Sequence, residues 1–432
     1  MRKPFTSLMT GLVLLATVVV PPFSMLKGAQ SMAGALVPVI GLYVFLFAAF
    51  CALHGPRPRL GKLTFIVTVV LPLVFAHGVL SFFINTMFNM DRFWQSYLFL
   101  IIFVFGASFL VFLAQRLPKY KADFAVKLVF YALLLNGLVT ILGYRALGNP
   151  SAVGFFSENS HYALSFLPFL LYMVVLSSRR KKWFFLFMGF LISIILNSLT
   201  LLVGITAIAI FALRLRQLVF LSITAIAISI PMVAMDYIDI GYYLERLDFG
   251  AEVPNLSLMV FMSGWERAYL NLIDFYGIGV GFQQFGFVRG EGELEIFEVF
   301  FSIGAAGLNL HDGSFIASKL ISEFGILAVI VLVAYLVYFV KSVRWLHEVS
   351  INGGETVDCR KVFFLACFVM FFIDLFIRGG GYFTSSGFLF MASLVWIGLP
   401  PVSRTPSGDN TSDHRFEPDN SAQSLIVSIL QK

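Results

Sequence analysis

The sequence predicts an all-α, polytopic integral membrane protein. Of its 432 residues, 59% are hydrophobic and 12% are charged, which is about half the charged fraction of a typical soluble domain. Apolar runs near the roughly 20 residues needed to cross the hydrocarbon core recur along the whole chain. The basic residues gather in alternate connections between these runs. Together these observations predict about 12 transmembrane helices, with both termini in the cytoplasm.

Apolar runs define the candidate spans. They lie at about 6–26, 31–53, 62–84, 93–114, 124–143, 161–177, 183–197, 199–213, 217–235, 314–340, 361–377 and 382–398. The stretch 183–213 is too long for one span and short for two, but the polar pair Asn197 and Ser198 at its middle suits a tight turn. We therefore divide it there. Residues 1–235 then hold helices one to nine, and residues 314–400 hold helices ten to twelve.

The orientation follows from the distribution of Lys and Arg, because basic residues are retained on the cytoplasmic side. With both termini inside, 22 of the 30 basic residues fall in cytoplasmic segments. A different number of spans would destroy this alternation. The net charge of +6 is then explained by membrane topology, and a nucleic-acid partner is not predicted.

The N-terminal run has a basic start, MRKPF, as a secretory signal peptide would. Its apolar stretch is long, no small-x-small cleavage site precedes Pro21 and Pro22, and another span follows at once. We expect an uncleaved first helix, with a cleaved signal as the alternative. Three cysteines, Cys51, Cys359 and Cys367, map to the cytoplasmic side or within spans, so neither an external disulfide nor a metal site is predicted.

One external segment, 236–313, is far longer than the other connections. Long loops are either functional or disordered, and this one has too many aromatic residues for a solvated linker. We expect a partly helical periplasmic loop that folds against the membrane surface. In contrast, residues 401–432 are polar and rich in turn-forming residues, which predicts a disordered cytoplasmic tail.

Two adjacent features stand out within the long loop. Residues 257–276 have apolar positions near helical spacing, with charged residues such as Arg267 between them, which predicts an interfacial amphipathic helix. The stretch GIGVGFQQFG follows at 277–286. Gly279 and Gly281 allow positive φ angles and close approach of the backbone to a ligand. A simple turn after the helix is the alternative.

Polar side chains gather at the predicted outer face. His161 opens the sixth span and His311 ends the long loop, so both face outward. The arginines that lie on this side against the general trend include Arg145, Arg246, Arg267 and Arg378. Guanidinium groups bind phosphate in a bidentate manner. Salt bridging is the alternative, because the long loop carries 12 acidic residues and three arginines.

Three segments of the chain carry a resemblance to known proteins. They are GFFSENSHYALSFLPFL at 154–170, SGWERAYLNLIDFYGIGVGFQQFG at 263–286 and LHDGSFIASKLISEFGILA at 310–328. They resemble segments of the bacterial O-antigen polymerase and O-antigen ligase family of polysaccharide enzymes. Their order, the late long loop and about 12 spans extend the resemblance over most of residues 1–400. The individual motifs are short and degenerate, so order and topology carry the resemblance.

The chain departs from the family pattern at two places. The family often has His-Asn where this chain has His311-Asp312, and the distance from His311 to Gly325 is about three residues longer than in the commonest pattern. Three residues are nearly one helical turn, so Ser314 is a rival for the place of His311. The usual Ser-Gly-Arg reads Ser-Gly-Trp at 263–265, and Arg267 follows two positions late.

The resemblance implies a membrane glycosyltransferase that polymerises undecaprenyl-diphosphate-linked oligosaccharides at the periplasmic face of the bacterial inner membrane. It implies no cofactor, no required metal and no nucleotide sugar. The expected catalytic residues are His311 as base or acceptor positioner, Arg267 as diphosphate stabiliser, and Glu158 with His161 as a pair that either supports the neighbouring catalytic groups or serves as an alternative base. The expected substrate-binding residues are Arg246, Arg145, His161, Arg378, Gly279 and Gly281. A chain-length regulator and a flippase of the same pathway are the expected protein partners.

Two other functions stay open at this stage. A glycan ligase of the same family would use the same donor, and the sequence alone does not separate it from a polymerase. A flippase or another transporter would need polar groups inside the membrane. The deep candidates are few: His77, Asn136, Asn197 and Asp374. The long folded external loop favours chemistry over transport. The sugar, its linkage and the polymer class are not specified by these features.

Overall fold

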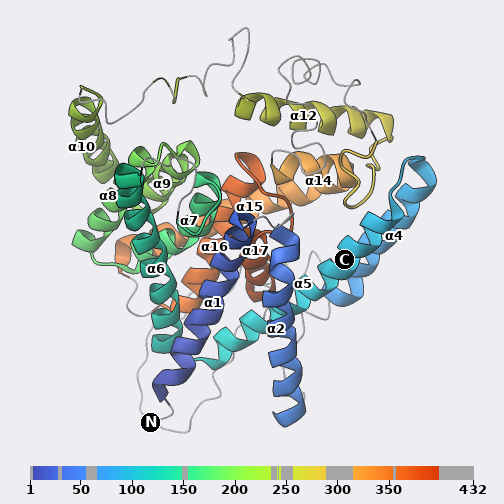
Figure 1. Cartoon of the computed structure of the whole chain (residues 1–432), viewed down its shortest axis with the longest axis horizontal. Helices are drawn as coiled ribbons and strands as arrows, with labels where there is room; N and C mark the ends of the chain where they lie inside the picture. The colour runs from blue at the N-terminus through green and yellow to red at the C-terminus, as the bar shows by residue number, and fades with distance from the viewer. Residues whose placement is uncertain are drawn as a thin grey trace, which may run out of the picture. The chain divides into compact units, whose positions relative to one another are not determined.

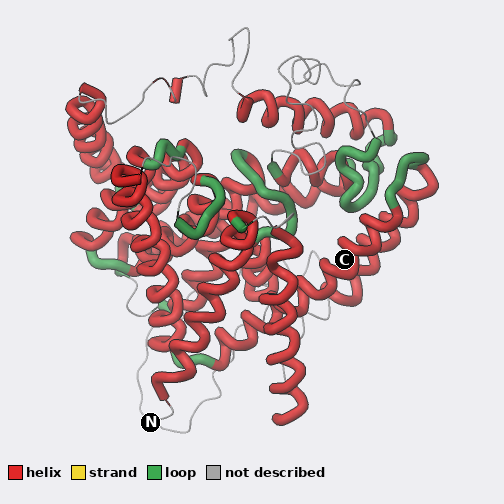
Figure 2. Tube along the Cα trace, in the orientation of Figure 1, coloured by secondary structure: helices red, strands yellow, loops and turns green. Residues whose placement is uncertain are grey.

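The computed structural model describes residues 3–27, 32–54, 66–147, 154–234, 241, 243–244, 256–288, 315–353 and 357–397. Within these ranges every regular element is helical (Figure 2), so the predicted all-α class is confirmed. Among the described residues, five helices are long and apolar enough to cross a membrane, at Val67–Ile84, Met90–Arg116, Lys119–Gly143, Asn159–Leu176 and Ile326–Asn352. This agrees with a membrane protein. The number of 12 spans and the side on which the termini lie stay predictions.

Each predicted span overlaps at least one helix. In chain order (Figure 1) the elements are α1 Lys3–Leu26, α2 Met32–His54, the π-helical turn η1 Ile66–Val70, α4 Leu71–Ile84, α5 Met90–Arg116, α6 Lys119–Leu147, α7 Asn159–Leu176, α8 Arg179–Ile195, α9 Leu199–Ala212, α10 Leu215–Ala234, α12 Leu256–Asp274, α14 Ile316–Phe324, α15 Ile326–Asn352, α16 Cys359–Phe376 and α17 Ser385–Ile397. The long loop predicted at 236–313 is described mainly over 256–288, and the predicted tail at 401–432 lies outside the described residues.

The division of 183–213 into two helices is confirmed. Asn197 has a φ of +48°, which ends α8, and asparagine tolerates this left-handed conformation better than most residues. The side chain of Ser198 then caps α9 by accepting a hydrogen bond from the backbone N–H of Leu201, at 3.3 Å. A polar pair in the middle of an apolar run was therefore a sufficient signal for the turn.

The helices α7 and α16 form the centre of the fold. Every side chain of α7 from Tyr162 to Val175 is buried, and α7 packs against α6, α8, α9, α15, α16 and α17. Gly204 of α9 permits close packing here, because a Cβ atom at that position would overlap the side chain of Leu167. The buried body of α7 thereby fixes its N-terminal end, where His161 lies.

The predicted tenth span, 314–340, is not one helix. Gly325 has a φ of +58° and a ψ of −134°, a conformation open almost only to glycine, and it separates α14 from α15. The N–H of Ile326 donates to the carbonyl oxygen of Gly277 at 2.8 Å. Lys319 and Glu323 therefore belong to a short separate helix, while the long apolar helix continues to Asn352.

We expect Gly325→Ala to destabilise the protein far more than Gly353→Ala. Both glycines have positive φ, so alanine introduces strain of about 1–3 kcal/mol in each variant. At Gly325 the new Cβ would also overlap the carbonyl oxygen of Gly277, whereas nothing lies within 4 Å at Gly353. Overpacking adds about 1–3 kcal/mol at Gly325 alone. Thermal unfolding of both variants in detergent measures the difference, and equal midpoints would contradict it.

Candidate functional site

Residues 277–286, here called the glycine loop, pack against α14. The N–H of Gly281 donates to the backbone carbonyl of Glu323 at 3.0 Å. Gly279 has a φ of +90°, and a Cβ atom there would lie 2.5 Å from the same carbonyl oxygen. The close backbone approach predicted for these glycines is present, but the neighbour is the protein itself. Substrate binding by Gly279 and Gly281 stays a prediction.

Polar residues of α4 hold the other side of the glycine loop. His77 places its Nε2 atom 2.9 Å from the carbonyl oxygen of Ile278, and the side-chain amide of Asn85 donates to the carbonyl oxygen of Val280 at 3.2 Å. These contacts satisfy two backbone carbonyl oxygens of the loop, which have no partner of the kind that a regular helix would provide. The glycine loop is thus fastened between α4 and α14.

The helix predicted at 257–276 is present as α12, and it packs beside α14 (Figure 1). Its position at the membrane interface stays a prediction. The side-chain amide of Asn271 donates to the hydroxyl of Ser322 at 2.6 Å. Arg267 is only 2% exposed, and its guanidinium carbon lies 4.8 Å from the centre of the Phe285 ring. This burial does not support the expected direct contact of Arg267 with a diphosphate. It favours a positioning role, in which a cation–π contact holds the glycine loop.

Glu323 links the glycine loop to the connection between α16 and α17. Its carboxylate is fully buried; Oε1 accepts the N–H of Phe285 at 3.3 Å, and Oε2 accepts the hydroxyl of Tyr382 at 2.9 Å. The ammonium group of Lys319 lies 5.2 Å from the centre of the Tyr382 ring. Burial raises the pKa of the Glu323 carboxyl, although the charge of Lys319 and these hydrogen bonds oppose the rise. The sequence analysis did not select Glu323 as a site residue.

The same connection, 377–384, carries Arg378 at its other end. The guanidinium of Arg378 lies 3.3 Å from the carboxylate of Glu158, and the neighbouring Nδ1 of His161 lies 3.1 Å from the hydroxyl of Ser157. The side chain of Arg378 is 32% exposed and that of Glu158 is 51% exposed. Three predicted site residues are thus brought together, and two of them remain accessible.

The charge environment defines what Glu158 can do. Burial pushes the pKa of the Glu158 carboxyl up, but the charges of His161 and Arg378 outweigh it, so the pKa lies below its usual range. A carboxylate with a lowered pKa is a weak general base at neutral pH. Of the two roles predicted for Glu158, its contact with Arg378 and its lowered pKa favour the supporting one, in which Glu158 orients Arg378, over that of a base.

Asp374, near the C-terminal end of α16, anchors the 377–384 connection. Its carboxylate is fully buried, and it accepts hydrogen bonds from the N–H of Gly380, at 3.3 Å, and from the hydroxyl of Ser386. Gly379 is also tightly packed, since a Cβ there would lie 3.0 Å from the Cα atom of Phe315. The connection is therefore fixed at both ends and in the middle, which keeps Arg378 and Tyr382 in one arrangement.

Several predicted residues cannot be placed in this arrangement. His311, its rival Ser314, and Arg246 lie outside the described residues. Arg145 lies in the last turn of α6, and its side chain is outside the description too. Their expected roles stay predictions.

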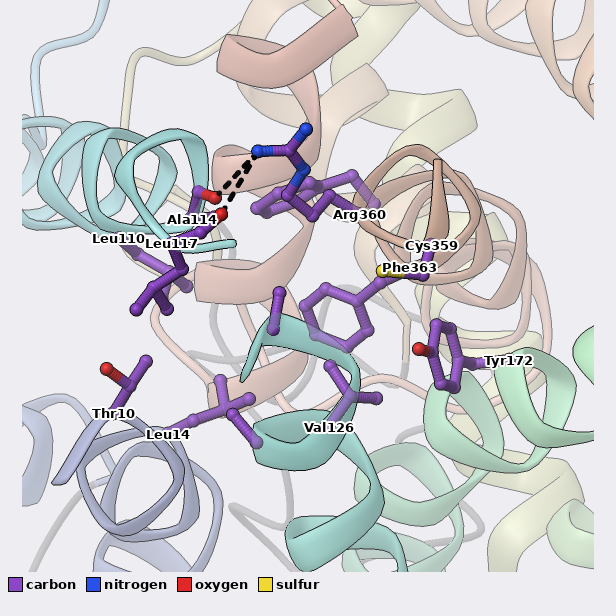
Figure 3. Close-up of a pocket in the computed structure, with 13 residues that line it drawn as sticks. Thr10, Leu14, Leu110, Ala114, Leu117, Val126, Tyr172, Cys359, Arg360 and Phe363 are labelled. Atoms are coloured by element: carbon purple, nitrogen blue, oxygen red, sulfur yellow. Dashed lines mark hydrogen bonds between the residues drawn. The ribbon is translucent and has the colours of Figure 1, made fainter. Parts of the chain in front are cut away.

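A separate pocket lies near the other end of α7 (Figure 3), and its lining residues are Thr10, Leu14, Leu110, Ala114, Leu117, Ala122, Ala125, Val126, Tyr172, Cys359, Arg360, Phe363 and Phe364. The guanidinium of Arg360 pairs with Asp358 at 2.6 Å and also donates to the carbonyl oxygens of Ala114 and Leu117. The charged side chain of this mostly apolar pocket, Arg360, is thus already paired with groups of the protein itself. None of the predicted site residues lines it, and we assign no function to it.

No protein-family model matches the chain, and no curated relative is detected.

Proposed function

We propose that the protein polymerises undecaprenyl-diphosphate-linked oligosaccharides at the periplasmic face of the bacterial inner membrane. The observation that carries this proposal is the 377–384 connection. It holds an accessible Arg378–Glu158 pair at one end and the buried Tyr382–Glu323 contact at the other. An accessible arginine at a helix end, beside a loop that is fixed from several sides, suits recognition of a lipid-linked diphosphate.

The chemistry assigns separate tasks to these groups. An acceptor hydroxyl must lose a proton as it attacks the anomeric carbon, while the departing diphosphate gains negative charge. Arg378 would stabilise that charge, and Glu158 would orient Arg378. Arg267 would hold the glycine loop through Phe285. His311 remains the predicted base or acceptor positioner, with Ser314 as its rival.

The contacts of the deep polar residues count against the transport alternative. His77 binds a loop carbonyl, the side-chain oxygen of Asn136 accepts the N–H of Phe155 at 3.1 Å, and Asn197 forms a turn. Asp374 anchors the 377–384 connection. Each group therefore supports a helix end or a loop, whereas a transporter needs polar groups that line a path.

Analysis of glycans from a deletion strain tests the proposed function and separates it from ligation. Loss of a polymerase should leave single repeat units attached to the final acceptor, whereas loss of a ligase should leave long chains on the lipid carrier. Gel electrophoresis with carrier-lipid extraction distinguishes these products. The intact gene should restore long chains, and a strain with unchanged glycans would contradict both activities.

A further inference from the structure

The helix α12 presents an apolar row on the side opposite its packed face. Its packed residues include Gly264, Arg267 and Asn271, all of which are buried. The exposed row consists of Met262, Trp265, Tyr269, Ile273 and the following Tyr276. At 100° per residue the four positions inside α12 fall within one narrow sector, roughly opposite the packed face, and Tyr276 follows the helix in a turn, with a φ of +52°. Tyr269, Ile273 and Tyr276 are 63%, 53% and 88% exposed.

Continuity with a candidate membrane span identifies the surface that covers this row. Gly277 directly follows Tyr276, and its carbonyl oxygen accepts the N–H of Ile326. Ile326 begins α15, which is long and apolar enough to cross a membrane, and the first side chains of α15 are themselves exposed and apolar, namely Ile326, Leu327 and Ile330. The end of the α12 row is therefore fastened to the point where a membrane-crossing helix begins.

The composition of the row favours lipid over sugar or an anionic surface. Tyrosine and tryptophan are enriched where a protein meets the membrane–water interface, and methionine and isoleucine gain from burial among acyl chains. A surface for stacking sugar rings would instead place amide or carboxylate side chains beside the aromatic rings, and the row contains neither. No member of the row is basic, so attraction to anionic lipid headgroups does not drive the contact.

We propose that the row Met262, Trp265, Tyr269, Ile273 and Tyr276 docks onto the lipid bilayer and is buried at its interface. A helix is about 10–12 Å across, so docking keeps Arg267 and the glycine loop within about that distance of the lipid headgroups. A lipid-linked diphosphate would lie at the same level. This last consequence depends on the proposed function, but the docking itself does not.

Collision measurements on a spin label test the docking without substrate. The label is attached to Tyr269→Cys, and to Asp274→Cys as the matched control, because Asp274 is exposed on the same helix outside the row. Both variants need replacement of Cys51, Cys359 and Cys367, and both are reconstituted into vesicles of phosphatidylcholine. At Tyr269 we expect the ratio of collisions with oxygen to collisions with a nickel chelate to be several-fold higher than at Asp274. The ratio should be unchanged when phosphatidylglycerol is added.

Two results would overturn the proposal. Equal nickel-chelate access at the two positions would show that the row faces water, as a glycan-binding surface would. Shielding of Tyr269 from both reagents would show that protein covers the row.

If the cysteine-free background fails to fold, tryptophan fluorescence supplies the test. The contribution of Trp265 is the difference in fluorescence between the unmodified protein and Trp265→Phe. Brominated phosphatidylcholine should quench that difference, and its persistence at full intensity would contradict lipid contact. None of these measurements depends on glycan synthesis, so they stay separate from a failure of the proposed function.

Discussion

Replacing Glu323 with Gln is expected to abolish polymer formation while the protein still inserts into the membrane. The two carboxylate oxygens accept different donors, Phe285 N–H and Tyr382 O–H. Glutamine has one oxygen and one NH₂ group, so it can accept only one of these donors. If that donor is the Phe285 N–H, the Tyr382 hydroxyl must turn to accept from the new NH₂ group, and both contacts lose the charge of the carboxylate. Each lost hydrogen bond to a charged group is worth about 1.5–3 kcal/mol. The glycine loop and the 377–384 connection would then lose their shared anchor.

Companion variants separate this anchoring role from simple destabilisation. Glu323→Gln alone leaves the positive charge of Lys319 buried without the negative charge of Glu323, and removing one partner of a buried charge pair costs about 3–5 kcal/mol of stability. Glu323→Gln combined with Lys319→Met removes both charges. We expect the double variant to recover stability but not polymer formation. Tyr382→Phe, which keeps the ring and removes one donor, should lose less activity than Glu323→Gln. The measurements are thermal unfolding in detergent and polymer length on gels. Normal polymer from Glu323→Gln would refute the anchoring role.

The sequence predicted those parts of the fold that depend on local signals. Apolar runs located the helices, and Asn197 with Ser198 marked a turn, because both signals are contained in a short window. The break at Gly325 was missed, since the strongly apolar residues after Gly325 keep the average hydropathy of 314–340 high despite Lys319 and Glu323. A single glycine inside an apolar run does not reveal its φ angle, which here depends on contact with Gly277 far away in the chain.

The candidate site was predictable only where its residues sit at helix ends. Glu158, His161 and Arg378 were selected from their positions beside apolar runs, and the structure brings them together. Glu323 was missed because its partners lie 38 and 59 residues away. The burial of Arg267 was not predictable either, for another reason. Helix α12 has apolar side chains on two faces, so periodicity alone does not say which face packs against the protein.

Replacing Arg378 with Gln is expected to reduce polymerisation strongly without destabilising the fold. The pair with Glu158 is accessible, and exposed pairs contribute only about 0–1 kcal/mol to stability. If Arg378 instead contacts the charge that develops on the diphosphate, its loss should cost about 2–4 kcal/mol in the transition state, roughly a 30-fold to 1,000-fold drop in rate. Arg378→Lys should recover only part of this, because lysine keeps the charge but loses the planar pair of donors.

A double-mutant cycle with Glu158→Gln identifies which partner Arg378 serves. If Arg378 acts on substrate and Glu158 only orients it, Glu158→Gln should lower the rate modestly, and it should have no further effect once Arg378 is replaced. Arg179→Gln is the control for loss of one positive charge, since Arg179 is exposed at the start of α8, remote from the 377–384 connection. Rates are measured on purified protein in proteoliposomes with a lipid-linked oligosaccharide. Equal, small effects of both single replacements would mean that the pair is a surface salt bridge, and Arg378 would then have no direct role in the reaction.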